Sequence, residues 1–134
     1  MSEKVLFDTD VLIWYFRGLD AAAEVIAATV FEQRFVSSLC IMELIQGCRN
    51  KKDLRDVNAF VKDTFSDVIH CDKTASERAI ALLRLHALGH GLRTVDALIA
   101  ATAIANGAAL VTGNFRHFEM IKGLNLVRFE PKPN

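Results

Sequence analysis

The sequence predicts an α/β protein with a mainly parallel sheet, and three observations lead to this prediction. Short apolar runs alternate along the chain with longer segments of helical periodicity, which is the pattern of βαβ units. Hydrophobic residues make up 51% of the 134 residues and charged residues 24%, which suits one folded domain with a substantial core. Both prolines, Pro131 and Pro133, lie near the end of the chain, so none marks an interior linker. We therefore expect a single domain over residues 1–134, with a frayed tail at 131–134.

Five short apolar runs indicate buried strands, because they are too short for helices and end at polar or turn-forming residues. They lie at residues 5–7, 35–37, 68–70 and 109–112, with a fifth within 124–129. The helical period predicts helices over about 11–18, 21–31, 40–48, 53–64, 75–88 and 95–105. A turn is expected at residues 8–10, and Thr94 is the expected N-cap of the last helix. Strands separated by helices form a parallel sheet that is covered on both faces.

Charge and cysteine content exclude several classes of protein. Sixteen basic residues balance sixteen acidic ones, so any binding of nucleic acid must depend on local patches or on a bound metal. The sequence has three cysteines, Cys40, Cys48 and Cys71. A small and odd number does not form a disulfide framework and fits a reducing compartment. Neither a signal peptide nor a membrane span is recognisable. We expect a soluble, cytoplasmic protein that does not contact a membrane.

Three acidic residues stand alone in apolar segments near predicted strand or helix ends. Asp8 follows the first strand, Glu43 is the only charge within residues 39–47, and Asp96 opens a helix that is apolar or small nearly all round. Ligands bind beyond the carboxyl ends of parallel strands, so we expect the three carboxylates to converge there. Converging carboxylates repel each other unless a divalent cation joins them, and oxygen ligands favour Mg²⁺ or Mn²⁺ over zinc. Metal-assisted hydrolysis of a phosphodiester is the chemistry that this arrangement indicates.

Each acid also has an ordinary structural interpretation. Asp8 or Asp10 can cap the next helix, and Glu43 can face solvent. Asp96 can interact favourably with the dipole of the helix that it opens. A pair of histidines four residues apart, His86 and His90, lacks a third zinc ligand and is not taken as a metal site.

Four segments carry a resemblance to a known family. They are LFDTDVLI at 6–13, SLCIMELIQG at 38–47, TVDALIAA at 94–101 and VTGNFRHF at 111–118. In this order they resemble the motifs of PIN domains, in particular VapC-type toxins of prokaryotic toxin–antitoxin pairs. The resemblance implies a PIN-like three-layer α/β/α sandwich with four to five strands, and a Mg²⁺- or Mn²⁺-dependent endoribonuclease. It also implies a homodimer and a VapB-type antitoxin whose C-terminal segment covers the acidic cleft.

The resemblance assigns roles residue by residue. Asp8 and Asp96 become metal ligands, and Glu43 becomes a ligand directly or through water. Many relatives place a fourth acid at the position of Asn114 or three residues later, where this chain has His117. The cluster therefore carries less negative charge, and the expected mechanism uses one ion held by Asp8 and Asp96, with Glu43 orienting the attacking water. Asn114 would form a hydrogen bond within the cluster or position a ligating water.

Other residues beside these motifs are candidates for supporting roles. Arg93 and Arg116 flank the acidic motifs and are placed to bind phosphates of an RNA substrate. Asp10, Thr112 and His117 are candidates for support of the acidic cluster, and the sequence does not decide whether His117 acts in catalysis or only packs.

Two other functions remain open from the sequence. The segment around Asp8 also resembles the nucleophile motif of haloacid-dehalogenase-like phosphatases, in which Asp8 would attack phosphorus and Asp10 would act as acid and base. That family needs a lysine and a later acidic pair, and the fourth strand here ends without an acid at Thr112 and Asn114. A PIN-like RNA-binding module that has lost catalysis would explain the missing fourth acid, but the retained acids argue against it.

Overall fold

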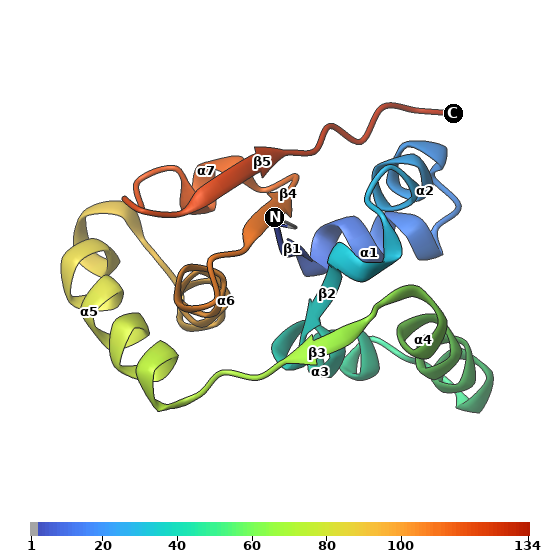
Figure 1. Ribbon diagram of the computed structural model, residues 1–134, viewed down its shortest axis with the longest axis horizontal. Helices are drawn as coiled ribbons and strands as arrows, with labels where there is room; N and C mark the ends of the chain where they lie inside the picture. The colour runs from blue at the N-terminus through green and yellow to red at the C-terminus, as the bar shows by residue number, and fades with distance from the viewer. Residues whose placement is uncertain (1–2) are drawn as a thin grey trace.

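The computed structural model describes residues 3–134 and places five strands in one sheet (Figure 1). The strands are β1 (Val5–Phe7), β2 (Arg34–Ser37), β3 (Asp67–Ile69), β4 (Ala109–Thr112) and β5 (Asn125–Arg128). Their order is β3-β2-β1-β4-β5, and each neighbouring pair is parallel. The predicted α/β class and parallel sheet are confirmed. Because β1 and β4 are neighbours in space but far apart in sequence, the order of the strands reverses beside β1, which is where α/β proteins open their ligand crevice.

Seven helices surround this sheet within the described residues. They are α1 (Thr9–Phe16), α2 (Asp20–Ala27), α3 (Ser38–Gln46), α4 (Lys51–Thr64), α5 (Lys73–His90), α6 (Thr94–Ala105) and α7 (Phe115–Phe118), with a 3-10 turn at Phe31–Gln33. Figure 1 shows α5 and α6 on one side of the strands and α1, α2 and α4 on the other, which makes three layers. No helix in residues 3–134 combines the length and the apolar character that a membrane crossing needs.

The observed boundaries correct several predictions. The turn expected at residues 8–10 is shorter, because helix α1 already begins at Thr9, whose N–H the Asp8 carboxylate accepts. The helix expected over residues 21–31 ends at Ala27. Arg93, not Thr94, is the N-cap of α6, and its side chain makes no capping hydrogen bond. The single-turn helix α7 was not predicted, since four residues are too few for a periodic pattern.

The core lies around β1, β4 and α6. Phe7 and Leu110 from the two central strands and Ile99 from α6 are fully buried. Helix α6 buries residues on nearly every side, and four of its buried positions are alanines, which allow neighbouring backbones to approach closely. This packing fixes the first turn of α6 against the carboxyl ends of the central strands, so the position of Asp96 is determined by the core.

The last residues of the chain lie outside every helix and strand. The predicted frayed tail, residues 131–134, is exposed. The Asn134 side chain nevertheless accepts a hydrogen bond from the N–H of Asp20 at 2.7 Å and donates one to the carbonyl of Gly18 at 2.9 Å. The tail therefore lies against the turn between α1 and α2.

Candidate active site

Asp8 lies at the point where the strand order reverses. It follows β1 directly, and its backbone N–H donates to the carbonyl of Val111 in β4 at 2.8 Å. Only 4% of Asp8 is exposed, and the residues on both sides of it, Phe7 and Thr9, are also buried. A carboxylate in such a position needs compensation from hydrogen bonds or from a positive charge.

Neutral donors satisfy both oxygens of Asp8. The N–H of Thr9 donates to Oδ1 at 2.8 Å, and the hydroxyl of Thr112 donates to Oδ2 at 2.8 Å. Thr112 Oγ1 in turn accepts the N–H of Asn114 at 3.0 Å. None of the ion pairs formed within residues 3–134 includes Asp8. Burial, together with the nearby charge of Asp10, raises the pKa of Asp8 to about 7.

Thr9 connects Asp8 to Glu43. Its hydroxyl donates to Glu43 Oε1 at 2.6 Å, while its N–H donates to Asp8. Glu43 lies on the exposed side of α3, as the structural interpretation allowed, but this hydrogen bond orients its carboxylate toward the turn that carries Asp8. The sequence motifs did not identify Thr9 as a functional residue. The signal that could have identified Thr9 is its position directly after Asp8, which places a hydroxyl beside an isolated acid in an apolar segment.

Asp96 lies in the first turn of α6 and faces His117. Its Oδ2 is 3.4 Å from Nδ1 of His117 in α7. Burial raises the pKa of Asp96, the charge of Glu43 raises it further, and the charges of His117 and Arg93 lower it. Asp96 also contributes to the raised pKa of Asp8. Asp96 is therefore near enough to interact unfavourably with both of the other predicted acids, Asp8 and Glu43.

The chemistry of these side chains fits a hard divalent cation. All three donors are carboxylates, and a cation beside them would offset both the burial and the mutual repulsion that raise the pKa values of Asp8 and Asp96. As the side chains stand, no three His, Cys, Asp or Glu residues among residues 3–134 form a group that encloses a metal ion. Glu43 uses only Oε1 in its contact with Thr9 and Asp96 only Oδ2 in its contact with His117, so each carboxylate can join an ion directly or through a bridging water.

Asp10 joins the start of α1 to the turn after β4. Its Oδ1 accepts the N–H of Val11, and its Oδ2 accepts the N–H of Gly113 at 2.9 Å. A Cβ at position 113 would lie 2.5 Å from that Oδ2, so the contact requires glycine. These two bonds give Asp10 a structural role in joining the start of α1 to the turn after β4.

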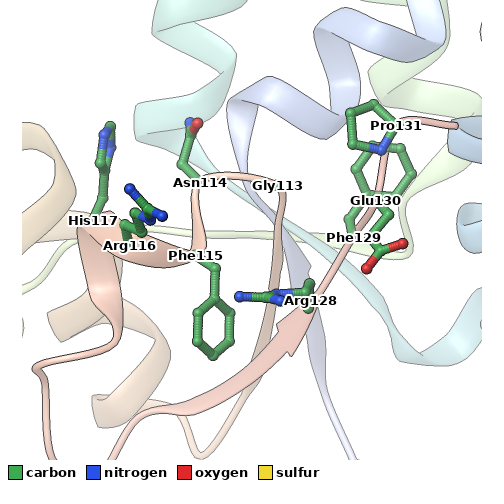
Figure 2. Close-up of a pocket in the computed structure, with 9 residues that line it drawn as sticks. All are labelled: Gly113, Asn114, Phe115, Arg116, His117, Arg128, Phe129, Glu130 and Pro131. Atoms are coloured by element: carbon green, nitrogen blue, oxygen red, sulfur yellow. The ribbon is translucent and has the colours of Figure 1, made fainter.

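The remaining predicted residues lie around the acidic cluster. Arg93 is exposed at the start of α6, and Arg116 is exposed on α7. The side chain of Asn114 is exposed and forms no hydrogen bond within the described residues, while its N–H is held by Thr112. Figure 2 shows Asn114, Arg116 and His117 on one turn, with Asn114 and His117 pointing to the same side.

Known proteins of similar sequence indicate the family to which this site belongs. The family model described as the PIN domain matches residues 5–123. Ribonuclease VapC19 of two strains of Mycobacterium tuberculosis is 37% identical over 124 residues, which cover 89% of this chain and 95% of that protein.

Solved structures show the same fold. A toxin-antitoxin complex from Klebsiella pneumoniae contains a chain with a TM-score of 0.79 and 28% identity, over 98% of this chain and 100% of that one. A chain in DNA-bound VapBC from Salmonella typhimurium has a TM-score of 0.81 at 24% identity, over 96% and 99% of the two chains, and supports the fold alone.

Proposed function

Since the chain belongs to the PIN-domain family, as a VapC-type ribonuclease toxin of a VapBC toxin–antitoxin system, we propose that it hydrolyses RNA phosphodiester bonds at the acidic cluster around Asp8. The observation that carries this proposal is the buried carboxylate of Asp8, which lies at the switch point of the sheet without a cationic partner in the described residues. RNA as substrate and three free cysteines favour action in the cytoplasm.

Asp8 and Asp96 are the residues that would hold Mg²⁺ or Mn²⁺, with Glu43 joining them directly or through water. When bound, such an ion stabilises negative charge on the phosphate in the transition state and acidifies water. Thr9 keeps the Glu43 carboxylate beside this position, where it orients the attacking water. The hydroxyl of Thr112 donates to Oδ2 of Asp8. This bond fixes the orientation of the carboxylate, and with it the direction of the lone pairs that would face the ion.

The positively charged residues around the cluster serve the substrate. Arg93 at the start of α6 and Arg116 on α7 bind phosphates of the RNA strand on either side of the cleaved bond. Asn114 positions a water beside the cluster. His117 holds the carboxylate of Asp96 in place, since its Nδ1 lies 3.4 Å from Oδ2.

The test is cleavage of a panel of structured RNAs in the presence of Mg²⁺ or Mn²⁺. We expect cleavage with either ion, a loss of cleavage in EDTA, and recovery when excess Mg²⁺ is added back. RNA binding without cleavage under every metal condition would instead support the RNA-binding module, which the amide at Asn114 in place of an acid favours.

We also propose that an antitoxin protein of the VapB type covers the acidic cleft. A groove of about 640 Å³ adjoins Glu43 between α1, α3 and α4, and it combines apolar Phe16 and Leu44 with charged Arg49 and Asp53. Such a mixture suits a partner segment with both apolar and charged side chains. The expected result is inhibition of RNA cleavage by the co-purified antitoxin, and a Phe16→Glu variant, at a side chain that is 40% exposed, should be inhibited at least about tenfold less strongly. Equal inhibition of both proteins would place the antitoxin elsewhere.

Two copies of the chain are proposed to associate. Helix α5 exposes Leu85 at 71% and Leu88 at 103%, and α3 exposes Met42 at 61%, which are large apolar side chains that a second copy of the chain would cover. We expect a dimer mass by light scattering and a monomer mass after Leu88→Glu. A monomer mass for the unchanged chain at micromolar concentration would contradict this.

A further inference from the structure

A second pocket lies beside the acidic cluster, on the side of β5 (Figure 2). It has a volume of about 390 Å³ and lies between the turn that leads into α7 and the end of β5. Asn114 and His117 line it from the α7 side, and Arg128 and Glu130 line it from the end of β5 and the segment after it. Because His117 contacts Asp96 directly, the pocket and the acidic cluster share a boundary.

The register of the sheet places Arg128 at the same end of the strands as Asp8. Arg128 pairs with Thr112 in the β4–β5 ladder, and the hydroxyl of Thr112 donates to Asp8. Neighbouring strands are about 4.8 Å apart, so Arg128 is one strand further out at the same end of the sheet. Asp8 follows β1, two strands from β5, so a group that binds at Arg128 lies about 10 Å from a group that binds at Asp8.

The guanidinium of Arg128 lies against an aromatic ring and remains available to a ligand. Its Cζ lies 4.4 Å from the centre of the Phe115 ring, which is a cation–π contact. Arg128 is exposed, and neither Arg128 nor Arg116 takes part in an ion pair within residues 3–134. The one acid in the pocket, Glu130, lies 3.9 Å from Lys132. The pocket therefore contains two arginines, Arg116 and Arg128, that pair with no acid within residues 3–134.

We propose that this pocket binds the nucleotide next to the cleaved phosphodiester of a single-stranded RNA, with its base stacked on the Arg128 guanidinium over Phe115. Bases stack on guanidinium planes and aromatic rings whatever their sequence, and Arg116 supplies charge for the adjoining phosphate. Phe115 acts by keeping the guanidinium in place. This inference rests on the proposed function, because it assigns a subsite to the same RNA substrate.

The experiment measures RNA binding separately from cleavage. The full-length protein in EDTA is titrated into short fluorescein-labelled single-stranded RNAs, and anisotropy gives Kd at several salt concentrations. We expect Arg128→Ala and Phe115→Leu each to weaken binding at least about fivefold. Arg128→Lys should lose affinity but keep the salt dependence, whereas Arg128→Ala should lower the slope of log K against log salt by about 0.7. Arg84→Ala, an exposed arginine on α5, is the matched control and should bind as the unchanged protein does.

The outcomes separate this inference from the proposed function. Unchanged affinity in Arg128→Ala and Phe115→Leu overturns the pocket assignment, even if the protein cleaves RNA. Weakened affinity in both variants supports it, even if the unchanged protein fails to cleave RNA with Mg²⁺. Absence of RNA binding by the unchanged protein overturns it as well. If Arg128→Ala binds RNA normally but resists inhibition by the antitoxin, the pocket binds a segment of the antitoxin, and the assignment to RNA is wrong. A circular-dichroism melt of each variant confirms that the fold is intact.

Discussion

Asp8→Asn is expected to lower the rate of Mg²⁺-dependent RNA cleavage at least about 100-fold while the protein stays folded. Loss of residues that only support a metal ligand commonly costs 10- to 100-fold, so loss of the ligand itself should cost more. The amide keeps an oxygen that can accept the N–H of Thr9, and its NH₂ group can donate to Thr112, so the surrounding hydrogen bonds can be retained. What disappears is the negative charge that a cation would meet. The measurement is the initial rate of cleavage of a labelled RNA at saturating Mg²⁺.

Asp63→Asn provides the matched control for this loss. Asp63 is an exposed residue of α4 that forms no ion pair within the described residues, and the same chemical change there should leave cleavage unaltered. Cleavage at equal rates by Asp8→Asn and the unchanged protein would show that the activity does not depend on this carboxylate. A loss accompanied by unfolding, detected by circular dichroism, would instead mean that the amide disrupts the turn.

The parts of the fold that follow from local patterns were predicted, and those that follow from distant contacts were not. Each of the five strand runs corresponds to an observed strand, because a short apolar run between polar residues has few alternatives to a buried strand. The end of α2 at Ala27 was missed, since alanine-rich sequence favours a helix beyond the point where packing ends it. The boundaries therefore depended on tertiary structure more than the elements did.

The same division applies to the candidate site. Asp8, Glu43 and Asp96 could be identified because an isolated charge in an apolar segment is visible in the sequence. The hydrogen bond from Thr9 to Glu43 and that from Gly113 to Asp10 join residues 34 and 103 positions apart. No local pattern carries such contacts, so the sequence placed Asp10 among the supporting candidates without showing what it supports. The stack of Arg128 on Phe115 was missed for the same reason.

The metal-free protein is expected to lose stability as the pH rises through the range in which Asp8 ionises. Its pKa is raised from 3.8 to about 7 in the folded protein, so the folded state binds a proton that the unfolded state has released. The free energy of unfolding therefore falls with increasing pH between about 4 and 7, and is level again above the folded pKa. One pKa unit corresponds to about 1.4 kcal/mol, so ionised Asp8 costs the folded protein roughly 4 kcal/mol at pH 8. Asp10 and Asp96 shift in the same direction and add to the effect.

Urea denaturation at pH 5 and pH 8, with and without Mg²⁺, isolates this contribution. Other groups also titrate in this range, so the informative quantity is the difference in unfolding free energy between the unchanged protein and Asp8→Asn. We expect Asp8→Asn to be the more stable of the two at pH 8 in EDTA, and its advantage to shrink at pH 5. Mg²⁺ should stabilise the unchanged protein more at pH 8 than at pH 5, because at pH 5 it must displace a proton from Asp8. A difference that stays constant with pH would mean that Asp8 is ionised throughout, and that its hydrogen bonds with Thr9 and Thr112 outweigh the cost of its burial.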